Sequence, residues 1–118
     1  MRLGWTLTLA AALAALASHA PAATIGDAEA SAHVGQTVTV IGIVTGTHVT
    51  AKGTEFLNFG SPYPEEDLTA VIFASSASEF GDVSQYYGKR LSVTGRVETY
   101  KGRTEIILRA RDQLRIIH

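Results

Sequence analysis

Hydrophobic and polar residues alternate over several stretches between residues 36 and 108, which is the pattern of β-strands with one buried face. Valine, threonine, isoleucine and phenylalanine are frequent there, and all four favour strands. The pattern predicts five strands, at 36–45, 54–59, 68–73, 89–100 and 104–108, followed by an apolar stretch at 114–117. A loop is predicted at 46–53, a turn at 60–67 and a hairpin turn at 100–103. Short helices are predicted at 24–35, with Asp27 as a candidate N-cap, and at 75–88, with Gly81 as a candidate break.

Two of these strands repeat one another. Segments 35–44 and 88–97 align at an offset of 53 residues, and Gly42 then falls on Gly95. A small closed barrel needs two long strands that each bend part-way, and a glycine permits the bend. The predicted order, β-β-β-α-β-β, is that of the OB-fold, an all-β five-stranded Greek-key barrel. An SH3-like or other small barrel is the alternative, but the helix after the third strand argues against it.

The N-terminal segment has the character of an export signal. One basic residue, Arg2, precedes an uncharged, largely apolar run of 15 residues at 3–17, and Ala20-Pro21-Ala22 fits a signal-peptidase site. An uncleaved anchor is the alternative, although a membrane-spanning helix needs about 20 apolar residues. We therefore expect a signal peptide at 1–22 and a single domain at 23–118. That domain would be periplasmic or secreted, with no stable membrane span after cleavage. The chain has no cysteine, so it has neither disulfides nor a lipid-modified cysteine.

Charge is distributed unevenly along the expected domain. Residues 23–88 carry one basic and eight acidic residues, whereas 89–118 carry eight basic and three acidic ones. Either the two parts pair in one sheet and neutralise each other, or the C-terminal part forms a basic face for phosphates. The net charge of 23–118 is −2, which is unfavourable for non-specific binding of polyanions.

Two segments carry a family resemblance. The sequence FLNFG at 56–60, a polar turn, and LTAVIF at 68–73 resemble the hairpin of strands two and three in tRNA-anticodon-type OB-folds. The flanking segments, HVGQTVTVIGIV and YKGRTEIILRARDQL, resemble a group of small exported bacterial OB-fold proteins described as nucleic-acid-binding-domain proteins. The resemblance covers about residues 25–117. It implies the OB-fold, and it implies that Phe56 occupies the position of a base-stacking aromatic.

The strand at 54–59 offers two opposite faces. If Leu57 and Phe59 fill the barrel, Phe56 and Asn58 face outward; the reverse assignment would bury Phe56. Ligands of OB-folds lie across strands two and three and the flanking loops. This location selects seven candidate ligand-binding residues: Lys52, Phe56, Asn58, Tyr100, Lys101, Arg103 and Arg109.

Motifs for catalysis, for a metal site or for a cofactor are not found. Neither HExxH nor CxxC occurs. The segment 46–53 does not match the GxxxxGK[ST] pattern of a phosphate-binding loop, because Gly53 is not followed by a lysine. Three adjacent carboxylates at 65–67 are typical of a solvated turn. The sequence therefore predicts a binding module, not an enzyme. Its ligand is single-stranded DNA, RNA or a nucleotide-like anion; the alternative is an envelope protein or peptide partner.

Overall fold

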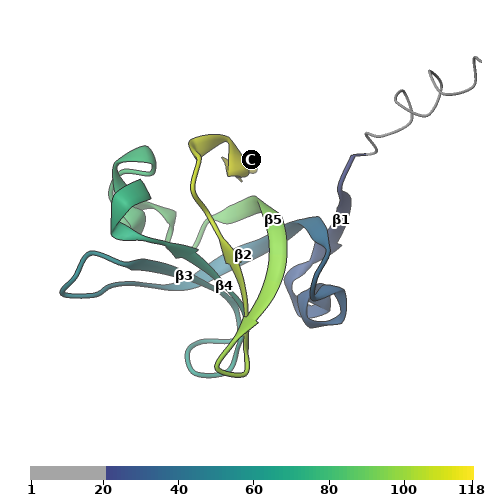
Figure 1. The fold of residues 1–118 in the computed structure, drawn as a ribbon. Coiled ribbons are helices and arrows are strands. Elements are labelled where there is room, and N and C mark those ends of the chain that lie inside the picture. The colour runs from purple at the N-terminus through teal and green to yellow at the C-terminus, as the bar shows by residue number, and fades with distance from the viewer. Residues whose placement is uncertain (1–20) are drawn as a thin grey trace, which may run out of the picture.

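The computed structural model describes residues 21–118, and the predicted signal peptide at 1–22 lies almost entirely outside this range. Seven strands and four short 3-10 helices follow one another (Figure 1). The strands are β1 (Ala23–Gly26), β2 (Thr37–Val49), β3 (Glu55–Gly60), β4 (Glu66–Ile72), β5 (Arg90–Tyr100), β6 (Arg103–Ile107) and β7 (Leu114–Ile116). The helices are η2 (Asp27–His33), η3 (Ala74–Glu79), η4 (Val83–Tyr86) and η5 (Arg111–Gln113).

Five of the strands close into a barrel. β2 pairs with β5 along its first half and with β3 along its second half. β3 pairs antiparallel with β4, β4 parallel with β6, and β6 antiparallel with β5, which completes the ring. This closed ring of β2 to β6 in Greek-key order is the OB-fold, so the predicted fold class is confirmed. β1 and β7 are additional strands at the edges, on β2 and β5 respectively.

The two repeated glycines lie where the long strands approach other parts of the barrel. A Cβ added at Gly42 would lie 3.1 Å from the ring of Phe59, and one at Gly95 would lie 2.6 Å from the side chain of Ile106. A larger residue would therefore push the bent strand off the core. The two repeated glycines thus allow the close contacts at which β2 and β5 each bend and pair with two different strands of the barrel.

The interior is apolar and closed at one end by the segment between β4 and β5. Leu57 and Phe59 point inward and are fully buried, as predicted for that face of β3. Tyr86 from η4 is also buried, and its hydroxyl donates a hydrogen bond to the carbonyl oxygen of Phe80 at 3.0 Å. Ala30 of η2 is buried in the same core cluster, so the N-terminal segment packs onto the barrel.

Three local predictions need correction. Strand β2 runs on to Val49, so the first half of the predicted loop at 46–53 is strand, because its threonine and valine residues pair with β3. Residues 75–88 form two separate 3-10 turns and not one helix; they are separated at Gly81, the candidate break, whose φ is 69°. The N-terminal helix is capped by Gly26, not by Asp27: the Gly26 N–H donates to Glu29 Oε1 at 3.0 Å.

Candidate functional site

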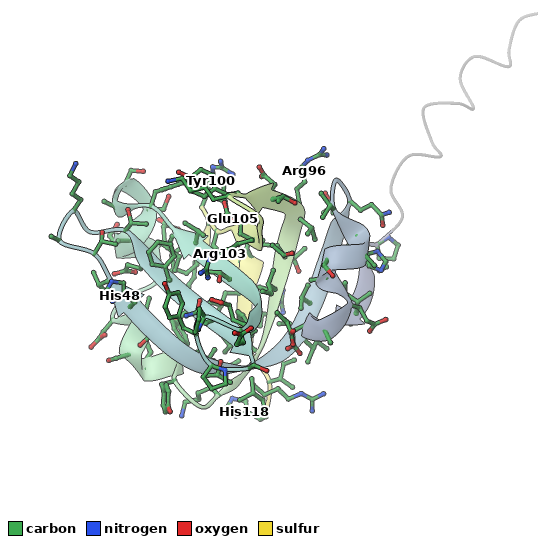
Figure 2. All side chains as sticks on the ribbon, turned by 90° about the horizontal axis from the view of Figure 1, so that it is seen from below. His48, Arg96, Tyr100, Arg103, Glu105 and His118 are labelled. Carbon is green, nitrogen blue, oxygen red and sulfur yellow. The ribbon has the colours of Figure 1, made fainter. Side chains whose placement is uncertain are left out.

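An open groove of about 800 Å³ runs over one face of the barrel. It lies over the second half of β2, over β3 and β4, and between the β3–β4 turn and the β5–β6 hairpin (Figure 2, where His48, Tyr100, Arg103 and Glu105 are labelled). Its volume is in the upper part of the range of small-ligand pockets. The lining residues are Thr45, Gly46, Thr47, His48, Thr50, Phe56, Asn58, Pro62, Tyr63, Glu66, Thr69, Tyr100, Lys101, Arg103 and Glu105.

Aromatic rings stand on three sides of the groove. Phe56 is half-buried, and its ring lies next to that of His48 on β2, with 6.3 Å between centroids and 9° between planes. Tyr63 and Tyr100, which are 68% and 58% exposed, project from the two flanking turns. A cation lies over each tyrosine ring: Arg103 at 5.0 Å from the Tyr63 centroid and Lys101 at 5.3 Å from the Tyr100 centroid. Each tyrosine ring therefore has a cation on one of its faces.

Arg103 is already paired. Its Nη1 donates to both carboxylate oxygens of Glu66, at 2.7 and 3.1 Å. The side chain of Glu66 is only 4% exposed, whereas that of Arg103 is 45% exposed. Within residues 21–118 this is the only ion pair, and it joins the start of β4 to the start of β6. Together with the contact to Tyr63, it fixes Arg103 as a support of the groove wall.

The floor of the groove is a polar row in register across three strands. Asn58 on β3 is opposite Thr69 on β4, and Thr69 is opposite Glu105 on β6. The Thr69 hydroxyl donates to Asn58 Oδ1 at 2.9 Å, and both side chains are nearly buried. Burial raises the pKa of Glu105, and the neighbouring charge of Glu98 raises this pKa further.

The structure brings most of the predicted binding residues together. Phe56, Asn58, Tyr100, Lys101 and Arg103 all line the groove. The remaining two, Lys52 in the turn after β2 and Arg109 after β6, are exposed and are not among the lining residues.

Sequence reasoning did not select His48, Tyr63, Glu66, Thr69 or Glu105, which also line the groove. Glu105 could have been found from Arg103, because residues two apart on a strand share a face. Tyr63 and Glu66 carry no such local signal, since the turn that places them is defined by long-range contacts.

The basic residues of the C-terminal part do not gather in the groove. All eight are exposed, and only Arg103 forms an ion pair in the described part of the chain, so the two halves do not neutralise each other residue by residue. Arg90 and Arg96 lie in the half of β5 that pairs with β2, and Arg115 lies on β7, away from the groove. The charged residues of the groove are two acids and two bases. Among residues 21–118, no three histidine, aspartate or glutamate side chains are grouped so as to hold a metal ion.

Comparison with known proteins identifies the fold. No family model matches the chain, and no curated protein matches it. Solved structures do match. The S. pombe Stn1–Ten1 complex does so with a TM-score of 0.53, at 12% identity, over 69% of this chain and 57% of that one. A candidate aspartyl-tRNA synthetase from Leishmania major Friedlin matches with a TM-score of 0.54, at 13% identity, over 85% of this chain and 21% of that one.

A third solved structure matches over its whole length. This is a candidate nucleic acid-binding lipoprotein from Klebsiella pneumoniae, with a TM-score of 0.50 and 11% identity over 95% of this chain and 100% of that one. The shared feature is the OB-fold. The chain spans 57% and 21% of the first two structures, so it matches one part of each of those proteins. At 11–13% identity the likeness concerns the arrangement of the strands.

Proposed function

We propose that this protein is an exported, single-domain OB-fold binding module, without catalytic activity, that binds single-stranded nucleic acid in the groove. The observation that carries the proposal is the set of three aromatic side chains that line the groove, Phe56, Tyr63 and Tyr100, of which the two tyrosines are largely exposed. Base stacking on aromatic side chains is the general means by which OB-folds bind single strands. A candidate nucleic acid-binding lipoprotein that shares the fold over its whole length supports the proposal.

The roles of the residues follow from their contacts. Phe56 receives a base on the face that His48 does not cover. Arg103 does not act as a free phosphate ligand, because Glu66 already holds it. Lys101 is exposed and lies in the hairpin turn, so it is the cation of the groove that is available to a phosphate. Binding should therefore depend more on stacking than on charge.

Export is supported by the sequence of residues 1–22 and by the start of the fold. Strand β1 begins at Ala23, so cleavage after Ala22 would leave the whole domain intact. Within residues 21–118, no helix has the length and apolar character needed to cross a membrane.

An envelope protein or peptide is the second candidate ligand. The balance of two acidic and two basic residues in the groove favours it, because such a groove attracts a polyanion little but can pair with both acidic and basic groups of a peptide. A peptide ligand would require no salt-dependent phosphate contact.

The test is a titration with fluorescently labelled single-stranded DNA and RNA of roughly ten nucleotides, within the range that one OB-fold covers. It is done at about 50 and 200 mM salt, where phosphate contacts become visible. We expect the logarithm of the association constant to fall linearly with log[salt]. The expected slope is about −0.7, which corresponds to one phosphate contact with a single strand. No binding at the lower salt concentration would refute the nucleic-acid proposal and favour a peptide partner.

A matched pair of variants tests the role of the ion pair. Glu66→Gln frees Arg103 and should steepen the slope by about 0.7, because a second cation becomes available to a phosphate. Glu65→Gln removes the same charge from the neighbouring exposed residue, which does not contact Arg103 through any ion pair in the described chain. Equal slopes for the two variants would show that Arg103 is not restrained by Glu66.

A further inference from the structure

The polar floor of the groove has a fixed direction of hydrogen bonding at one end. Asn58 Oδ1 accepts a hydrogen bond from the Thr69 hydroxyl, so the orientation of the Asn58 amide is set. Its Nδ2 group makes no hydrogen bond within residues 21–118 and carries two N–H donors. This end of the floor therefore offers donors to a ligand.

The other end of the floor offers an acceptor. Glu105 lines the groove and is partly buried, and no hydrogen bond or ion pair to its carboxylate is found in the described residues. Burial and the charge of Glu98 both raise the pKa of Glu105, so both disfavour its ionised form. A carboxylate in this state gains most from a ligand that brings two N–H donors side by side.

The bases differ in the donors that they can bring. Guanine carries two adjacent donors on its Watson–Crick edge, the N1–H and the 2-amino group, with the O6 acceptor beside them. Adenine and cytosine each offer one amino group at that edge, and uracil and thymine each offer one ring N–H. Only guanine can therefore satisfy both carboxylate oxygens while it accepts from a neighbouring amide.

We propose that the groove selects guanine, with Glu105 accepting from N1–H and the 2-amino group and Asn58 donating to O6. This inference rests on the proposed binding of nucleic acid and assigns its base preference. Thr69 acts as a positioning residue, since it orients the Asn58 amide and does not itself touch the base.

The position of Phe56 agrees with this reading. His48 on β2 is directly opposite Phe56, and the two rings are parallel, with 6.3 Å between their centroids. Asn58 is two residues along the same strand and on the same face. Side chains stand roughly perpendicular to a sheet, so a base stacked on Phe56 presents an edge to the row of Asn58, Thr69 and Glu105.

The experiment uses oligothymidine probes of roughly ten nucleotides with one central guanine, inosine, adenine or cytosine. A single guanine avoids association of the probes with one another. Inosine keeps N1–H and O6 but lacks the 2-amino group. We expect the guanine probe to bind about tenfold more tightly than the adenine and cytosine probes, within the range of one bidentate base contact. The inosine probe should lose most of this advantage.

Two glutamate variants serve as test and control. Glu105→Gln should bind all four probes with similar affinity, because an amide oxygen replaces the two carboxylate acceptors. Glu98→Gln removes the charge that faces Glu105 across the hairpin, but Glu98 does not line the groove. This control should keep the guanine preference.

Each outcome distinguishes the two proposals. If no probe binds the unmodified protein, the proposed nucleic-acid function fails and the base preference with it. If all four probes bind the unmodified protein equally, nucleic-acid binding stands and the guanine inference is overturned. Guanine preference that survives Glu105→Gln would also overturn it, since another group must then read the base.

Discussion

Replacement of Phe56 by alanine tests the groove most directly. Phe56 is half-buried, lines the groove and has one ring face next to His48. Loss of one base stack costs about 1–3 kcal/mol of binding free energy. At 1.4 kcal/mol per factor of ten, this weakens single-strand binding about 5- to 150-fold.

The effect on folding separates a groove residue from a core residue. Phe59 lies three positions along the same strand, is fully buried and faces the interior. Phe59→Ala should cost about 3–5 kcal/mol of folding free energy, as other buried phenylalanines do. Phe56→Ala removes a side chain that is only half-buried, so it should cost roughly half as much. In a domain of this size, the loss of about 3 kcal/mol expected at least for Phe59→Ala lowers Tm by about 12 °C or more.

Both variants are compared by fluorescence anisotropy with a labelled single strand and by urea denaturation. The expected result is strongly reduced binding with modest destabilisation for Phe56→Ala, and severe destabilisation for Phe59→Ala. Unchanged affinity in Phe56→Ala would refute the stacking role. Equal destabilisation of the two variants would mean that Phe56 belongs to the core.

Three further changes test the surroundings of the groove. Lys101→Asn should flatten the salt dependence of binding by about 0.7 in slope, and asparagine tolerates the φ of 50° at this position; an unchanged slope would remove Lys101 from the phosphate contacts. Gly102 has a φ of 77° and open space around it, so Gly102→Ala should lower the free energy of unfolding by about 1–2 kcal/mol in urea denaturation. Gly60→Ala should cost clearly more, because the Asp67 carboxylate lies where the new Cβ would be. The reverse order of the two losses would contradict this close packing. Glu105→Gln should raise stability at neutral pH. A raised pKa of Glu105 means that the folded state holds the proton more tightly than the unfolded state, so the free energy of unfolding of the unmodified protein falls as pH rises above about 4.5. The stability advantage of Glu105→Gln should therefore disappear below that pH. An advantage that does not change with pH would refute the raised pKa of Glu105.

The sequence predicts those parts of the fold that depend on local patterns. Alternation identified the five barrel strands, the paired glycines Gly42 and Gly95 identified the two bent strands, and the turn at Lys101 and Gly102 was identified from its residue types. Such features need only neighbouring residues to be recognised. The end of β2 could not be placed, because pairing with β3 outweighs the glycine signals at 46–53.

The candidate site was predicted less completely than the fold. Phe56 and Asn58 follow from strand alternation, and Tyr100 and Arg103 follow from the hairpin. The pairing of Arg103 with Glu66 joins residues 37 positions apart and depends on the parallel contact between β4 and β6. Contacts of this kind are set by topology, so no local pattern could show that Arg103 is held by an acid.

The charge of the groove and the state of Glu105 lead to one conclusion about specificity. Two acids and two bases line the groove, so in the proposed complex a single strand gains little by charge alone, and its affinity would come from stacking on the aromatic rings. Stacking accepts every base, so discrimination depends on the polar floor. A partly buried carboxylate with no partner in residues 21–118 costs folding free energy that glutamine would not cost. That cost is offset when a ligand donates N–H groups to Glu105, and titratable groups with perturbed pKa values are typical of functional sites.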